Sequence, residues 1–375
     1  KHLKFIKFDT SLVLDMSRMF DGLTSLETLD LGDTFDTSNV DLMSGMFYNN
    51  RALKSLNLGN KFDTSNVIDM GYMFNGLTSL ETLDLGDNFD TSRVTDMPYM
   101  FAGMTSLKQL DLKEKFDTSN VTNMSRIFSS KFLPLDNYNV DFPSVPFKNV
   151  NKNEFNYSLQ VLNLGNKFNT SNVEDMTEMF FGLVSLQSLD LGDKFNTSNV
   201  YNMWGMFAGL NSVKSLDLGN NFDTSKVVSF TDMFAGMGNL ERINMGDKFF
   251  TEQVDNRYDP KYEDPSSEFE PGWNTPFANM FYNVSKLKSI KTGNDLLDRR
   301  LNPPESQPIP PSETELYTGK WIKKYDYEGN RLYNQTPKEQ IWGGDSARDI
   351  AGTWVWETKF DVDDFGDGKY VYTLN

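Results

Sequence analysis

Acidic residues at a fixed spacing are the first feature of this sequence that could do chemistry. Each lies between the two leucines of a repeated L-x-L segment, and the five of most interest are Asp30, Asp84, Asp111, Asp190 and Asp217. Carboxylates in pairs hydrolyse glycosidic bonds, and carboxylates in rows attract cations or basic proteins. Every acid of this set is periodic, however, whereas a unique active site should interrupt the period. We therefore predict a protein that is not an enzyme.

The composition excludes several other kinds of site. The chain has no Cys, which rules out disulfides, thiol nucleophiles and Cys-based zinc sites, and its one His is His2. We expect no cofactor and no metal site. The net charge of -17 disfavours nucleic acid as a partner, because binding it requires a positive surface. No run of 18 apolar residues is present, so we do not expect a membrane-spanning segment.

A repeat of 27 residues must position these acids. The phrase FDTSNVIDMGYMF at 62–74 returns as FDTSRVTDMPYMF at 89–101, and similar phrases recur along the chain. Such a period indicates a solenoid, in which neighbouring turns bury one another's apolar edges. Like residues should then lie over like residues, about 4.8 Å apart. We predict an α/β solenoid, a right-handed leucine-rich-repeat-like array of about nine 27-residue repeats, mostly β with short helical or 3-10 turns. The M-x-x-M-F segment should form such a helical or 3-10 turn.

The domain organisation follows from breaks in the period. We expect a solenoid over 1–301, with insertions near 129–153 and 252–275. A Pro-rich linker should occupy 302–315, and an aromatic, β-rich C-terminal piece should occupy 316–375. Sixty residues are marginal for an independent core without disulfides, so this piece fits a small module or a cap on the last repeat equally well.

The repeated units resemble a known family. SLETLDLG followed by FDTSNV and then D-M-x-x-M-F is similar to the BspA-like leucine-rich repeat surface proteins of Gram-positive bacteria, over roughly residues 8–292 and in nine copies. The resemblance implies a secreted or cell-wall attached protein, often one that adheres to host proteins, mucus or other cells. It implies no enzyme activity. It supplies no binding residues, because the partners of the family vary.

Two surfaces are candidates for partner binding. The strand face carries the acidic columns, so we expect it to be small, polar and acidic. These columns form either a groove for cations or a basic protein, or a solvated face where Asx side chains bond to one another. A neighbouring column of lysines, including Lys115, Lys167 and Lys194, should neutralise part of this charge. The insertions offer aromatic residues that either anchor a partner or pack back onto the convex side. These residues are Tyr138, Phe142, Tyr258, Tyr262 and Trp273.

Together these features predict a non-enzymatic bacterial cell-surface adhesin that is secreted or cell-wall attached. Its partner would be an extracellular protein, mucin or glycan, and we expect the chain to be a monomer. The alternative is a structural spacer of a cell-wall protein with no ligand of its own, because regular repeats predict that role as readily.

Overall fold

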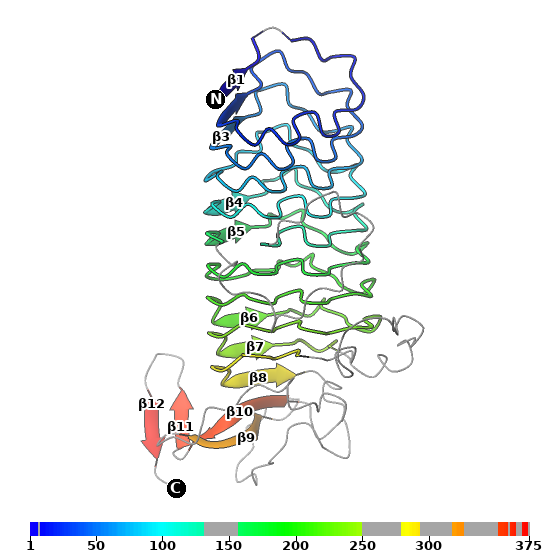
Figure 1. Cartoon of the computed structure of the whole chain (residues 1–375). Helices are drawn as coiled ribbons and strands as arrows, with labels where there is room; N and C mark the ends of the chain where they lie inside the picture. The colour runs from blue at the N-terminus through cyan, green and yellow to red at the C-terminus, as the bar shows by residue number, and fades with distance from the viewer. Residues whose placement is uncertain are drawn as a thin grey trace, which may run out of the picture.

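The chain is wound into a stack of similar turns. The computed structural model describes residues 1–6, 8–130, 157–249 and 279–292, and beyond them the backbone of four strands. Figure 1 shows the turns lying over one another, with the short strands aligned along one side of the stack. The Leu-x-Leu segment of each repeat supplies these strands, because its alternating leucines face the interior.

The strands pair in parallel with the strand of the next turn, with like residue over like residue. Leu29 lies over Leu56, Leu110 over Leu162, and Ile243 over Ile290. The strands are β1 (His2–Lys4), β2 (Thr28–Asp30), β3 (Ser55–Asn57), β4 (Gln109–Asp111), β5 (Val161–Asn163), β6 (Ser215–Asp217), β7 (Arg242–Asn244) and β8 (Ser289–Thr292). The corresponding segments 82–84 and 188–190 do not form strands, so the sheet is interrupted there.

The last turn of the stack is continued by C-terminal strands. These are β9 (Tyr317–Tyr325), β10 (Gly352–Thr358), β11 (Asp361–Asp364) and β12 (Tyr370–Thr373). β10 pairs antiparallel with β8 and with β9, which gives the sheet order β6-β7-β8-β10-β9, while β11 and β12 pair with each other. The sheet edge at β8 is therefore covered by β10. The assignment of 316–375 as a cap or as an independent module stays a prediction.

Two ladders of phenylalanine rings run through the interior. In the first, the rings of Phe62, Phe89 and Phe116 are stacked with centroids 6.4 Å apart at each step. In the second, Phe74 and Phe101 are stacked at 5.7 Å. All five side chains are buried, together with the Val and Met of the same phrase. The predicted register of the repeats is confirmed, and it explains why the same apolar letters recur: each ring is covered by its copy in the next turn.

The ladders also cross both breaks in the period. The Phe128 ring stacks on Phe180 at 5.7 Å, although the two residues are 52 positions apart. The Phe234 ring stacks on Phe281 at 5.3 Å. The turns on either side of each break are therefore direct neighbours.

The polar residues of the repeated FDTSNV sequence join adjacent turns. Thr64 is fully buried, and its hydroxyl donates to the Asp90 carbonyl at 2.8 Å and accepts from the Asp90 N–H at 2.8 Å. The Asn66 amide donates to the Ser38 carbonyl of the preceding turn at 2.7 Å. Copies of both bonds recur along the stack, so Thr and Asn satisfy the backbone groups that a solenoid would otherwise bury without partners.

One expectation about the turns is wrong. The M-x-x-M-F segment was expected to form a short helical or 3-10 turn, but the described repeats have a succession of non-helical turns there. Its third residue has a positive φ in every described copy, for example 60° at Tyr72 and 57° at Arg126. A left-handed residue breaks a helix. The Tyr72 N–H donates to the Pro98 carbonyl of the next turn at 2.9 Å, while the Met73 N–H bonds locally to the Met70 carbonyl at 3.2 Å. The segment is therefore a β-turn tied to the next repeat and does not continue as a helix.

Candidate functional site

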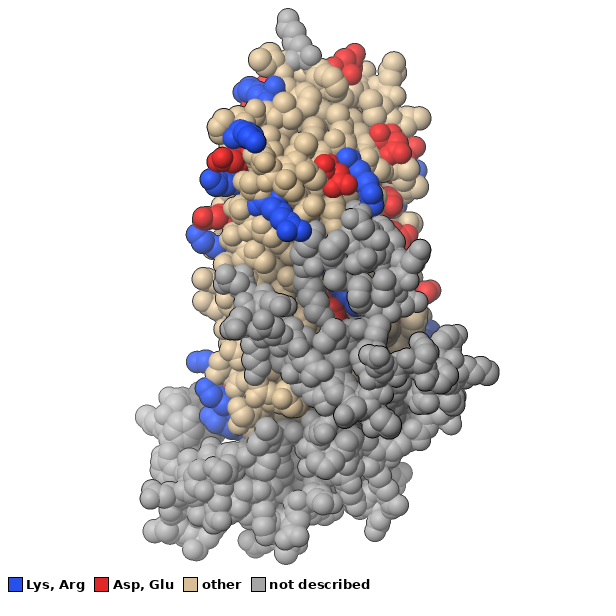
Figure 2. All heavy atoms as spheres, in the orientation of Figure 1, with Lys and Arg blue, Asp and Glu red and all other residues tan. Residues whose placement is uncertain are grey.

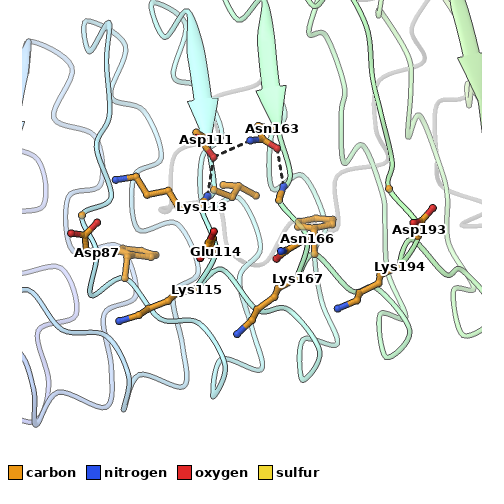
Figure 3. Close-up of a pocket in the computed structure, with 16 residues that line it drawn as sticks. Asp87, Asp111, Lys113, Glu114, Lys115, Asn163, Asn166, Lys167, Asp193 and Lys194 are labelled. Carbon is orange, nitrogen blue, oxygen red and sulfur yellow. Dashed lines mark hydrogen bonds between the residues drawn. The ribbon is translucent and has the colours of Figure 1, made fainter.

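A groove runs across four successive turns at the point where the chain leaves the strands. It encloses about 1280 Å³ and is lined from the turns that follow 84, Asp111, Asn163 and 190. Figure 3 shows Asp111 and Asn163 at the ends of β4 and β5, with the other polar side chains spread below them. The polar side chains of the groove are Asp87, Asp111, Lys113, Glu114, Lys115, Asn163, Asn166, Lys167, Asp193 and Lys194.

The floor of the groove is part of the core. Phe89, Leu112 and Phe168 line it and are almost completely buried, with at most 3% of their surface exposed. Phe89 belongs to the first ring ladder, and Phe168 stacks on Phe195 at 6.4 Å. Because these side chains are held by packing, the polar groups above them stand on a rigid base. The groove therefore requires no rearrangement to present its side chains.

A backbone turn with positive φ carries the chain from each strand into the groove. Glycine occupies this position in most turns, as at Gly165 with a φ of 74°, but Lys113 occupies it after β4 with a φ of 60°. The Asp111 carboxylate accepts the Lys113 N–H at 3.0 Å, which stabilises the turn. A non-glycine residue here costs roughly 1 kcal/mol in backbone strain. This position places one additional ammonium group beside the groove.

The lysines of the groove differ in their ion pairs. Lys113 donates to the Asp84 carboxylate, and this bond lowers the pKa of Asp84. Lys167 lies 3.9 Å from the Asp117 carboxylate. Within the described part of the chain, Lys115 and Lys194 have no carboxylate within 4.0 Å. Figure 3 shows Lys115, Lys167 and Lys194 extended in the same direction, away from the strands, so they form a row of cations, here called the lysine row.

Amides replace carboxylates around this row. Asn163 stands where the preceding turn has Asp111, and Asn166 stands where it has Glu114. Asn169 and Asn196, each two residues after a lysine of the row, likewise occupy the position of Asp117. Four lysines and four acidic residues line the groove, so its formal charge is zero in a chain whose net charge is -17. The groove is thus much less negative than the chain as a whole.

The predicted acidic column is held by hydrogen bonds to the backbone and to the next turn. Each of its five carboxylates accepts the backbone N–H two residues ahead, at 2.9–3.0 Å. Three also accept a bond from the Asn amide of the next turn, at 2.9 Å for Asp30, 3.2 Å for Asp111 and 2.9 Å for Asp217. Only Asp111 lines the groove. The column thus has the Asx-to-Asx bonding that the second interpretation of the strand face predicted.

The strand face carries mixed charge rather than only acids. Lys54 pairs with Glu27 at 3.0 Å, Lys108 pairs with Glu81 at 2.6 Å, and Lys4 pairs with Asp30 at 2.7 Å. Figure 2 shows positive and negative side chains alternating along this edge of the stack. The expectation of a small, polar and acidic face therefore needs correction: lysines of successive turns neutralise the glutamates next to the strands.

The aromatic residues of the insertions lie outside the described residues. This holds for Tyr138, Phe142, Tyr258, Tyr262 and Trp273, so their assignment as partner-binding residues stays a prediction. Sequence reasoning noticed the lysine column but assigned it to neutralising the acids, and it missed Lys113. The usable signal was the break of the DLG triplet into DLK at 111–113.

The described residues contain neither a candidate metal site nor a candidate membrane-spanning helix. No group of three or more His, Cys, Asp or Glu side chains there is arranged to hold a metal ion. Among the same residues, no helix has the length and apolar character needed to cross a membrane.

Comparisons with known proteins give a family and two similar solved structures. A search of curated proteins found no match. The solved structures are a leucine-rich repeat protein from Bacteroides ovatus (14% identity, TM-score 0.37, covering 80% of this chain and 64% of that one) and the Leptospira interrogans leucine-rich repeat protein LIC12759 (14% identity, TM-score 0.27, covering 74% and 58%). The chain thus spans less than two thirds of the length of either.

The family match rests on the repeats themselves. The family described as "Mycoplasma protein of unknown function, DUF285" matches residues 3–82, 54–159 and 146–259. These overlapping matches cover more than half of the chain and nearly all of the described turns. The chain belongs to the DUF285 family.

Proposed function

We propose that this protein is a non-enzymatic surface adhesin that binds an extracellular protein, mucin or glycan. The observation that carries the proposal is the groove, in which the polar side chains of four successive turns stand over a rigid apolar floor. Binding sites commonly join a preformed concave surface to a few polar groups at defined positions.

The finer identity belongs to the same proposal. We propose that the chain is a BspA-like surface protein of a Gram-positive bacterium, secreted or attached to the cell wall, with about nine right-handed repeats of 27 residues. The repeated phrases SLETLDLG and FDTSNV support this identity. The chain would act as a monomer, and the length of the stack would hold the groove away from the cell wall.

Direct binding measurements test the proposal. The purified chain would be presented to extracellular-matrix proteins, mucin and a glycan array, with folding checked by circular dichroism. We expect saturable binding to at least one class. Uniformly absent binding by folded protein would instead favour the spacer, whose only requirement is the rigidity that the ring ladders give.

A further inference from the structure

We propose that the groove binds a hydroxyl-rich polysaccharide that carries widely spaced anionic groups. This inference rests on the proposed adhesive function and names the ligand class for it. The lysine row of Lys115, Lys167 and Lys194 would pair with the anionic groups. The carboxylates and amides beside the row would bond to the hydroxyls of the sugars.

The cations are available for a ligand. Lys115 and Lys194 have no carboxylate within 4.0 Å in the described part of the chain, and Lys167 has only the distant one of Asp117. An exposed ammonium of this kind gains a modest but real attraction from an anionic ligand. The three lysines belong to successive turns, about 4.8 Å apart. The three ammonium groups therefore lie close together along the stack, so a single anionic group of an extended polymer would be shared between neighbouring lysines.

The rest of the lining selects against a densely charged ligand. Asp87, Asp111, Glu114 and Asp193 would repel a polymer that carries a charge on every unit. Carboxylates and amides are, however, acceptors and donors that suit hydroxyl groups. A chain of sugars with occasional carboxylates satisfies both halves of the lining, because its hydroxyls meet the acids while its anions meet the lysine row.

The groove also differs from a typical protein interface. Protein hot spots centre on large apolar or aromatic anchors that fill pockets. Here the apolar residues of the groove, Phe89, Leu112 and Phe168, are at most 3% exposed and offer no such pocket. The side chains above them are charged residues and amides without an aromatic anchor, which favours a hydrophilic ligand over an acidic protein.

The stack itself provides variants that should fold. Asn88 and Asn221 occupy the position of the lysine row in other turns, and their amides donate to backbone carbonyls at 3.1 and 2.9 Å. The substitutions Lys115→Asn, Lys167→Asn and Lys194→Asn therefore copy a side chain that this position already accepts. The control replaces the two lysines of the same column outside the groove, Lys61→Asn and Lys248→Asn. Its match in charge is the double groove variant Lys115→Asn, Lys194→Asn.

A second variant adds charge instead of removing it. Asn166→Asp, Asn169→Asp and Asn196→Asp restore the acids found in other turns. At the position of Asn169 and Asn196, the Asp117 carboxylate accepts the Ser119 N–H at 3.0 Å. The probes are hyaluronan, heparin, neutral dextran and poly-glutamate, measured by biolayer interferometry with the full chain. We expect hyaluronan to bind in a salt-sensitive manner and to bind more tightly than the other three.

Each outcome decides the proposal. The lysine-row variant should bind hyaluronan about tenfold more weakly, the acid variant should lose affinity in the same direction, and the control should keep it. Equal binding by the wild type and both groove variants would overturn the ligand class while leaving an adhesive function intact. Preference for heparin, dextran or poly-glutamate, or no binding to any of the four, would overturn it as well. Failure to bind matrix proteins, mucin and glycans altogether would remove the proposed function.

Discussion

The ring ladders predict a sharp dependence of stability on position along the stack. Phe101 is 1% exposed, and its ring contacts Phe74 at 5.7 Å, Phe128 at 5.9 Å and Phe116 at 6.1 Å. The substitution Phe101→Ala removes these contacts and leaves a cavity that neighbours on both sides hold open. We expect it to lower the free energy of unfolding by about 3–5 kcal/mol.

The same substitution at the first turn provides the comparison. Phe8 is 44% exposed and is covered on one side only, by Phe5 at 5.2 Å and Phe35 at 6.3 Å. Because its cavity opens to water and half of its surface is already wet, Phe8→Ala should cost about 1 kcal/mol.

Urea denaturation, followed by circular dichroism and by tryptophan fluorescence, measures both costs. Repeat arrays can unfold in parts, so hydrogen exchange around residue 101 should accompany the equilibrium data. Equal losses in the free energy of unfolding for the two variants would refute the reasoning. They would mean that a ring stacked and buried between two neighbours stabilises the protein no more than a half-exposed ring at the end of the stack.

Three further predictions concern the polar and backbone features of the turns. Thr118→Val should lower the free energy of unfolding by about 1–3 kcal/mol, because the buried hydroxyl bonds to the backbone of the next turn; thermal melts check this, and Thr118→Ser should retain most of the stability. Gly59→Ala should be more destabilising than Gly86→Ala in the same melts, because both have positive φ but only the first would place a Cβ against the carbonyl of the preceding turn. Asp69→Asn should stabilise the protein at neutral pH, because burial raises the pKa of Asp69 and the charged form is therefore disfavoured in the fold; the gain should disappear at a pH below the ordinary Asp pKa, and Asn123 shows that this column accepts an amide.

Periodicity made the interior predictable. Each apolar letter has one environment in a stack, so Phe89 could be assigned to a ladder from spacing alone, and the structure places it between Phe62 and Phe116. The turn at M-x-x-M-F was mispredicted because its spacing also suits a helix. What decides the conformation is bonding to the next turn, as from Tyr72 to Pro98, and no local pattern encodes such a bond.

The groove was less predictable than the core for a related reason. It depends on departures from the repeat, such as Lys113 in a glycine position and Asn166 in an acidic one. Single departures carry little weight in a sequence until the turns that hold them are placed side by side. The lysine column was noticed, yet the freedom of Lys115 from carboxylates follows only from three-dimensional distances.

Register across the first break in the period is the central claim, because the groove exists only if the turn after Asp111 lies against the turn after Asn163. The chain has no Cys, so a crosslink between two introduced cysteines can be detected without competing thiols. Gln109 and Val161 are directly paired in the parallel ladder, about 4.8 Å apart, which lies within the reach of a disulfide. Mild oxidation of the Gln109→Cys, Val161→Cys variant, followed by mass spectrometry, should give an internal crosslink, while Gln109→Cys with Ser188→Cys, two turns away, should give none. A crosslink in the second pair without one in the first would contradict the stacked register and the groove built on it.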